Sequence, residues 1–279
     1  MKLVREILKY LFSIILALGA FVLLICNIAN STILNKDYIY SVLEHSGYYQ
    51  KVYDLAYENF SIYVMQSGFE ENIFDGILTL DKVKSDSQII FNNIYENRED
   101  IVDTEVIKIN LRQNIDAFLE DTGVKAEEKS LKMYESIISE QYKYSVNYHT
   151  SIIKVLADGV KTVNSVISRV ETFAEIAIAI SLFMVILLNL RSIVVILNSL
   201  GVSSLFFGML SILFKFFIDQ FFNFDVLLVV NKALTDLLEY LLNSIYNTLL
   251  IYGIGFSVIG LFLILAGSYK QAKQKLQDE

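Results

Sequence analysis

Few side chains in this sequence have the chemistry of a catalytic or metal-binding centre. The two histidines, His45 and His149, lie far apart in the chain. Neither stands in the His-x-x-x-His spacing that places two imidazoles on one face of a helix around zinc. His149 instead falls on an apolar stripe of helical period, where a histidine at the edge of a core is expected. The pattern therefore favours a structural role over metal binding or general-base catalysis.

The remaining reactive groups lead to the same conclusion. The single cysteine, Cys26, lies in an apolar run, which excludes an intramolecular disulfide and disfavours a reactive thiolate. The sequence contains no glycine-rich phosphate loop and no Gly-x-Ser-x-Gly turn of a serine hydrolase. Acidic residues cluster at 96–105, but they lack the spacing of a calcium loop and fit the start of a helix better. We therefore predict no enzyme activity, no cofactor and no metal site.

Tyrosines are the more suggestive residues. Twelve of the 17 lie within residues 38–148. Tyrosine combines a large apolar ring with a polar tip and is favoured where proteins bind peptides, glycans or other proteins. The alternative is that these aromatic side chains simply build a small core. The candidate interaction surface consists of Tyr48, Tyr49, Tyr53 and Tyr57.

Composition indicates which kind of protein carries these residues. Hydrophobic residues make up 54% of the 279 and charged residues 19%, and the two kinds occupy different segments. Such segregation is typical of a membrane protein. Residues 34–170 carry 14 Lys and Arg against 22 Asp and Glu. An acidic segment of this kind argues against nucleic acid, which is bound by clustered cations.

The first apolar segment, residues 10–29, follows a basic N-terminus with Lys2, Arg5 and Lys9. A helix of about 20 apolar residues spans the hydrocarbon core of a bilayer. The run is longer than the roughly 7–15 apolar residues of a cleaved signal peptide. The bias of positive charge toward the cytoplasm therefore predicts an uncleaved anchor, within residues 1–33, whose N-terminus is cytoplasmic.

Three further spans complete the predicted topology. A short cytoplasmic connector, residues 191–198, joins the second span to the third, and an amphipathic outer helix, residues 219–246, joins the third to the fourth. The tail, residues 268–279, is basic again. The same charge bias therefore predicts that the C-terminus lies in the cytoplasm and that the spans cross the cell membrane. The further spans are predicted at 172–190, 199–218 and 247–267.

Residues 34–171 are expected to form one extracytoplasmic helical domain. Apolar residues recur there at spacings of three and four, without the alternation of a strand, so the fold class is all-α. Residues 126–190 are predicted to form one helix of about 95 Å that continues from this domain into the second span. Gly159 is its weak point, at about 1 kcal/mol relative to alanine, and its expected hinge.

Two ionisable residues are predicted inside the spans. Glu175 lies 16 residues before Arg191, and Lys215 lies 16 residues after Ser199. Both would then sit roughly 24 Å from the inner face of the membrane, at the level that Asn27 reaches from the first span. An ion pair between Glu175 and Lys215 is one hypothesis, because charges in lipid seek partners. The alternative is that each side chain extends to the outer headgroups.

Two segments carry a resemblance to known proteins. They are DYIYSVLEHSGYYQKVYDLAYENF at 37–60 and DTEVIKINLRQNIDAFLEDTGV at 103–124. Together with the pattern of span, Arg191, short connector and span, they resemble a group of uncharacterised bacterial integral membrane proteins. That group has four spans and one large helical extracytoplasmic domain. The resemblance implies the topology above and no activity.

The sequence thus predicts a multi-pass protein of the cell membrane that is not an enzyme. Its partners would be the lipid bilayer and a protein or cell-envelope component bound by the outer domain. The alternative is a permease-like or sensory subunit, which passes movement of the outer domain to a cytoplasmic partner. The second function requires a contact surface at residues 191–198 or at the termini.

Overall fold

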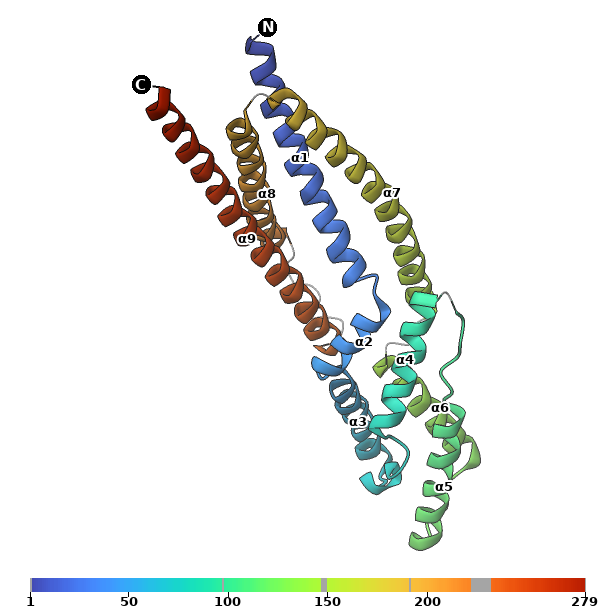
Figure 1. Ribbon diagram of the computed structural model, residues 1–279. Helices are drawn as coiled ribbons and strands as arrows, with labels where there is room; N and C mark the ends of the chain where they lie inside the picture. The colour runs from blue at the N-terminus through green and yellow to red at the C-terminus, as the bar shows by residue number, and fades with distance from the viewer. Residues whose placement is uncertain (1, 97, 147–149, 191, 222–231, 279) are drawn as a thin grey trace. The chain divides into compact units, whose positions relative to one another are not determined.

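The computed structural model describes residues 2–96, 98–146, 150–190, 192–221 and 232–278. Within these ranges the regular elements are all helices (Figure 1), which confirms the predicted all-α class. The chain divides into two compact units. Unit 1 comprises Met1–Tyr38, Asn164–Leu228 and Leu238–Glu279, and unit 2 comprises Ile39–Val163 and Val229–Leu237.

Four helices of the described residues are long and apolar enough to cross a membrane. Their spanning segments have mean hydropathies of 2.1 to 2.7. The predicted number of spans is therefore confirmed, and the chain is a multi-pass membrane protein whose spans contact lipid. The helices are α1 (Lys2–Ser31), α7 (Thr150–Asn189), α8 (Ile193–Phe221) and α9 (Lys232–Asp278).

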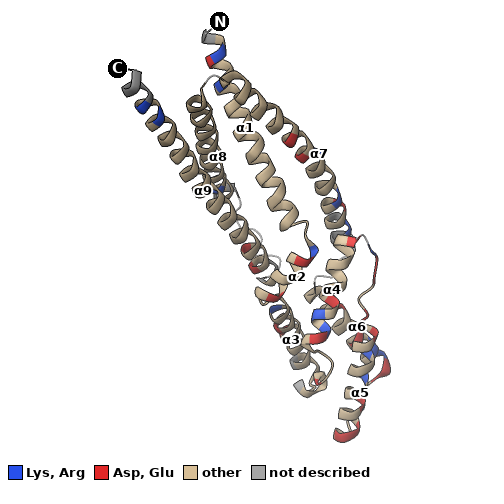
Figure 2. Ribbon diagram, in the orientation of Figure 1, with Lys and Arg blue, Asp and Glu red and all other residues tan. Residues whose placement is uncertain are grey.

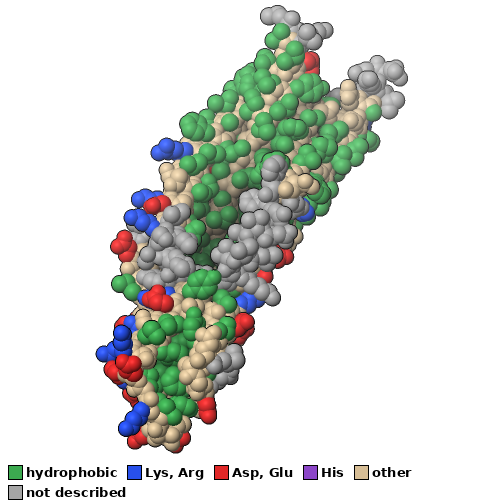
Figure 3. Space-filling view, turned by 180° about the vertical axis from the view of Figure 1, so that it is seen from behind, with side chains coloured by type: hydrophobic (Ala, Val, Ile, Leu, Met, Phe, Trp, Pro, Cys, Tyr) green, Lys and Arg blue, Asp and Glu red, His purple; other side chains and the backbone are tan. Residues whose placement is uncertain are grey.

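Charged and apolar side chains are segregated in the structure as they are in the sequence. Lys, Arg, Asp and Glu are sparse along α1 and α8 and frequent on the helices of unit 2 (Figure 2). Hydrophobic side chains cover much of the described surface of the spans on the face shown in Figure 3. This distribution is the one expected when the spans are solvated by lipid and unit 2 by water.

Unit 2 is built from short helices whose apolar stripes meet in one core. Apolar residues at spacings of three and four run along α5, and Ile107, Leu111 and Ile115 among them are at most 1% exposed. Gly123 ends α5 at a φ of +68°, a left-handed conformation that glycine adopts without strain. The elements are α2 (Lys36–His45), α3 (Tyr48–Ser67), η1 (Glu71–Phe74), α4 (Leu80–Glu96), α5 (Glu105–Thr122) and α6 (Glu128–Ser145).

The structure does not confirm one helix over residues 126–190. Helix α6 ends at Ser145, and α7 begins at Thr150, with residues 147–149 outside the described part. Residues 140–150 contain neither glycine nor proline, so nothing in the local sequence marks this end. Val146, which follows α6, is 0% exposed and belongs to the buried core.

The amphipathic segment 219–246 was expected to be a separate outer helix. In the structure residues 219–221 end α8, and residues 232–246 belong to the same helix as the fourth span. Residues 222–231 lie outside the described part. Helix α9 has 47 residues. It is therefore about 70 Å long, more than twice the hydrocarbon thickness of about 30 Å. No glycine or proline lies between residues 232 and 252 to end it earlier.

Gly159 lies inside α7 rather than at a break, so its role as a hinge stays a prediction. A Cβ added there would meet no heavy atom within 4 Å. Gly159→Ala is therefore expected to stabilise the protein by up to about 1 kcal/mol, because alanine favours the helix. Thermal unfolding of the detergent-solubilised protein, followed by circular dichroism, measures this.

Gly123→Ala is the matched control for Gly159→Ala. A Cβ at Gly123 also meets nothing within 4 Å, but its φ is +68°. Alanine is strained in that conformation, so this variant should be less stable than the parent. A lower melting temperature for both variants would mean that Gly159 is not helical in solution.

Candidate functional site

The candidate site residues of unit 1 lie on helices that pack closely. Helix α1 contacts α7 at Gly19, where a Cβ would lie 2.9 Å from Ile178 Cγ1 and 3.5 Å from the backbone oxygen of Ala174. At one end of this contact, Arg5 Nε donates a hydrogen bond of 2.8 Å to the carbonyl oxygen of Leu188. A cationic side chain at the last carbonyls of a helix stabilises that end of α7.

Helices α8 and α9 approach each other through glycines. A Cβ on Gly208 would lie 2.5 Å from the backbone oxygen of Gly253, and one on Gly260 would lie 2.7 Å from the backbone oxygen of Gly201. Ser204 Oγ also donates a hydrogen bond of 2.6 Å to the carbonyl oxygen of Phe256 across the interface. Small residues that let backbones approach are the usual basis of helix pairing in lipid.

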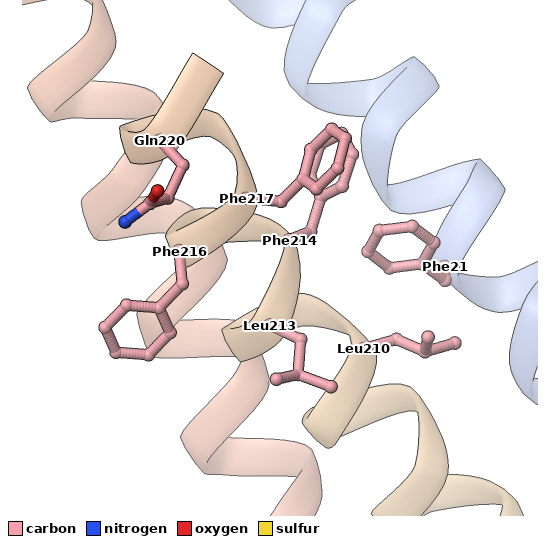
Figure 4. Close-up of a pocket in the computed structure, with 7 residues that line it drawn as sticks. All are labelled: Phe21, Leu210, Leu213, Phe214, Phe216, Phe217 and Gln220. Carbon is pink, nitrogen blue, oxygen red and sulfur yellow. The ribbon is translucent and has the colours of Figure 1, made fainter. Parts of the chain in front are cut away.

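An apolar pocket lies between α1 and α8. The rings of Phe21 and Phe214 meet edge to face at a centroid distance of 5.4 Å. The pocket has a volume of about 570 Å³ and is lined largely by aromatic side chains (Figure 4). Gln220 is the polar side chain among the lining residues. The chemistry of this lining suits an acyl chain rather than a polar substrate. The other lining residues are Leu210, Leu213, Phe216 and Phe217.

Glu175 and Lys215 have different neighbours in the structure. Lys215 Nζ lies 5.1 Å from the ring centroid of Phe216 and 5.5 Å from that of Tyr246, so it makes cation–π contacts with α8 and α9. Glu175 is exposed on α7, and the ion pairs of the described residues do not include one between Glu175 and Lys215. Asn27 is exposed on α1.

The polar contact between the first two spans involves neighbours of these predicted residues. Asn30 Nδ2 donates to Glu171 Oε2 at 3.4 Å, a long hydrogen bond between α1 and α7. Asn30 and Glu171 lie about one helical turn from Asn27 and Glu175 respectively. This contact joins the first span to the second, whereas the predicted ion pair of Glu175 and Lys215 would join the second span to the third.

The predicted tyrosine surface divides into two halves. Tyr48 and Tyr49 are 2% and 6% exposed and belong to the core of unit 2, so they are not available to a partner. They lie on the same side of α3 as the buried Val52. Tyr53 and Tyr57 lie on another side of α3, where their rings stack at a centroid distance of 6.3 Å. Only this second pair remains a candidate interaction surface.

A buried polar network in unit 2 was not apparent from the sequence. Tyr142 Oη, on α6, donates a hydrogen bond of 2.5 Å to Asp86 Oδ2 on α4. Lys82 Nζ lies 3.0 Å from the same oxygen, and it donates to the backbone oxygen of Asp103 at 3.0 Å. Asp86 is 4% exposed and Tyr142 is 0% exposed. The network ties α4 and α6 to the segment before α5.

Buried tyrosines make the stability of unit 2 sensitive to high pH. Burial raises the pKa of Tyr142, and the hydrogen bond and negative charge of Asp86 raise it further. Burial, reinforced by Glu44, raises the pKa of Tyr49 to about 12. In the unfolded chain each tyrosine ionises at about pH 10, so the stability that depends on the neutral ring is present below pH 10 and lost above it.

We therefore expect the free energy of unfolding to fall between about pH 10 and pH 12. Tyr142→Phe should make this decline shallower, by up to about 1.4 kcal/mol per pH unit, since one titrating group is removed. Denaturant unfolding at several pH values, monitored by near-ultraviolet circular dichroism, measures the slope. Ile138→Val, in the core on α6, removes no titrating group, so it should lower the free energy of unfolding and leave the slope unchanged. Equal slopes for the parent and Tyr142→Phe would contradict the assignment.

The side chains considered for metal chemistry are not brought together within the described residues. His45 Nδ1 lies 2.6 Å from the backbone oxygen of Ser41, one turn earlier on α2, and His149 lies outside the described part. Among the residues that the structure describes, no three His, Cys, Asp or Glu side chains lie together as a metal site would require. In the acidic segment, Asp103 Oδ1 accepts a hydrogen bond of 2.9 Å from the backbone N–H of Glu105, as expected near a helix start.

Comparison with known proteins does not supply a function. No protein-family model matches the chain, and no curated protein or solved structure matches it. The function is therefore inferred from the chain itself.

Proposed function

We propose that this protein is a non-enzymatic protein of the cell membrane, whose unit 2 lies outside the membrane and binds a protein or another envelope component. The observation that carries the proposal is the stacked pair Tyr53 and Tyr57 on the surface of α3. Tyr57 is 39% exposed, whereas Tyr48 and Tyr49 of the same helix are buried in the core of unit 2. Stacked aromatic rings at a surface supply contact area with little loss of side-chain entropy.

Charged neighbours of the tyrosine pair indicate what kind of partner fits. Asp54 and Glu58 are exposed beside Tyr53 and Tyr57 on α3. Gln50 Nε2 donates a hydrogen bond of 2.8 Å to Asp54 Oδ1. Aromatic faces flanked by carboxylates suit a partner that presents cationic or hydroxyl groups, such as a basic peptide or a glycan.

The proposed orientation rests on the distribution of positive charge. Arg5 and Lys9 lie at the start of α1, and Lys270 and Lys273 lie near the end of α9. Positive charge beside a span favours the cytoplasmic side, so both termini are proposed to be cytoplasmic. An odd number of spans separates the C-terminus from unit 2, and the unit is therefore proposed to be extracytoplasmic.

Photo-crosslinking in intact cells tests the proposed binding surface. A photoreactive amino acid replaces Tyr57 in one variant and Tyr144, which is 51% exposed on α6, in another. We expect a defined crosslinked product from position 57 and little from position 144. Addition of Tyr53→Ala should reduce the product from position 57. Equal products from both positions, or none from either, would contradict the proposal.

A second function is favoured by two helices whose residues belong partly to unit 1 and partly to unit 2. The residues of α7 and α9 are shared between unit 1 and unit 2. A permease-like or sensory subunit would use such helices to pass movement of unit 2 to a cytoplasmic partner. The connector would be the contact surface, although Arg191 itself lies outside the described residues. A photoreactive amino acid at Ser192 should then capture a cytoplasmic protein, whereas binding through unit 2 alone predicts no such product.

The resemblance to bacterial four-span membrane proteins remains part of the proposal. It agrees with four apolar helices, and it would place the protein in a bacterial envelope. A single cysteine agrees with that setting, because secreted eukaryotic domains usually carry disulfides.

A further inference from the structure

Glu175 lies near the middle of the second spanning segment, Leu156–Asn189. Gly19 stands midway along the apolar run 10–29 of α1, and a Cβ there would be 2.9 Å from Ile178 and 3.5 Å from the backbone oxygen of Ala174. Glu175 follows Ala174 directly, so it shares this depth. The number of residues between Glu175 and Arg191 predicts instead a position near the outer boundary of the membrane. The hydrogen bond from Arg5 to Leu188 explains the difference, since it puts the last turn of α7 level with the basic N-terminus.

The side chain of Glu175 points away from the helix that α7 packs against. The buried positions of α7 are Ala174, Ser181 and Val185, at 6%, 1% and 0% exposure, and they recur at helical spacing. Glu175 is exposed, as is Phe173, which is 74% exposed. The carboxylate therefore faces away from α1, on a side of α7 that the described chain leaves uncovered.

Glu175 has no polar partner within the described part of its own chain. Neither the hydrogen bonds nor the ion pairs found there involve its carboxylate, whereas Glu171, one turn away, accepts a hydrogen bond from Asn30. Lys215 makes contacts with aromatic rings. A carboxylate within a spanning segment is expected to bind a cationic group where one is available. Ionisable groups at this depth nearly always face another protein group.

The residues around Glu175 would let a second helix approach closely. Ser168, Thr172 and Ala179 lie on the same stripe of α7, at seven, three and four residues from Glu175, and all are exposed. Thr172 Oγ1 donates its hydrogen bond to the backbone oxygen of Ser168, so this hydroxyl proton is not donated to the carboxylate of Glu175. Small residues on one stripe permit close contact between helix backbones in lipid.

We propose that this stripe of α7 docks a transmembrane helix of another protein that carries a lysine or arginine at mid-membrane depth. Charge complementarity identifies the partner, because a cation is what an exposed carboxylate in lipid requires. A second copy of this chain would place Glu175 against Glu175, and like charges repel strongly in a medium of low dielectric constant. The proposal concerns unit 1 and does not depend on the role of Tyr53 and Tyr57.

Disulfide trapping with model transmembrane peptides tests the proposal. The full-length protein carries Cys26→Ser and Ala179→Cys and is reconstituted in phosphatidylcholine vesicles. Leucine-rich spanning peptides bear one cysteine and, one turn away, a central lysine, leucine or glutamate. We expect the lysine peptide to crosslink about tenfold more than the leucine peptide, and the glutamate peptide to crosslink no more than it. Glu175→Leu should bring the lysine peptide down to the level of the leucine peptide.

Two controls make the result specific. Ile254→Cys, at a position of α9 that is 56% exposed, should capture the lysine peptide only at background level. Thermal unfolding of Glu175→Leu should match that of the parent, because the carboxylate has no partner among the residues that the structure describes. The proposal is overturned if the three peptides crosslink equally at Ala179→Cys, or if Ile254→Cys captures the lysine peptide as well. It is also overturned if the protein crosslinks to itself in preference, which would indicate a second copy as the occupant.

Discussion

Gly260→Ala is expected to destabilise the protein by about 2–3 kcal/mol, because it forces α8 and α9 apart. The added Cβ would lie 2.7 Å from the backbone oxygen of Gly201 and 2.7 Å from the backbone nitrogen of Leu205. Both neighbours are backbone atoms, so neither can rotate away as the end of a side chain could. The whole interface would have to widen, and its hydrogen bond from Ser204 to Phe256 would lengthen or break.

Gly255→Ala provides the matched comparison. Gly255 lies on the same helix, and a Cβ there would meet nothing within 4 Å. This variant should be as stable as the parent, or slightly more stable. Thermal unfolding of both variants in the same detergent, followed by circular dichroism, measures the difference. Equal loss of stability in the two variants would show that the loss does not come from the close approach of α8 and α9.

Asp86→Ala is expected to destabilise unit 2 by about 3 kcal/mol, since it removes the acceptor at the centre of a buried network. Tyr142 Oη would lose a hydrogen bond of 2.5 Å, and Lys82 Nζ would lose its carboxylate at 3.0 Å. A buried polar group that is left without its partner bears the full cost of desolvation. Denaturant unfolding of the full-length protein, monitored by near-ultraviolet circular dichroism, measures the loss.

Glu44→Ala is the control for Asp86→Ala, because it breaks another Lys–carboxylate pair in the same unit. Lys84 Nζ lies 2.7 Å from Glu44 Oε2, but the two side chains are 40% and 58% exposed. Exposed ion pairs contribute only about 0–1 kcal/mol. If Asp86→Ala lowered the free energy of unfolding no more than Glu44→Ala does, the buried network would not hold α4 and α6 together.

Local periodicity predicted much of the fold. Apolar residues at spacings of three and four predicted the buried stripe of α5, and Gly68 and Gly123 lie where α3 and α5 end. Long apolar runs predicted four spans. These features depend on residues that are close in the sequence, so they can be predicted without knowing which helices contact each other.

Features that depend on packing between distant residues were not predictable. The hydrogen bond between Asp86 and Tyr142 joins residues 56 positions apart, and no spacing rule links them. The burial of Tyr48 and the exposure of Tyr57 depend on which side of α3 faces the core, and tyrosine is compatible with either side. The contact of α7 with Gly19 of α1 likewise joins residues that are far apart in the chain.

Cysteine accessibility tests the central claim, that four spans separate an extracytoplasmic helical unit from cytoplasmic termini. In a Cys26→Ser background, single cysteines replace Ile101 in unit 2, Tyr269 near the end of α9 and Phe262 in the fourth span, at 75%, 73% and 70% exposure. A membrane-impermeant maleimide added to intact cells should label Ile101→Cys at once and Tyr269→Cys only after lysis. Phe262→Cys should remain unlabelled in lipid under both conditions. Labelling of positions 101 and 269 from the same side, or rapid labelling of position 262 in the intact membrane, would contradict the account.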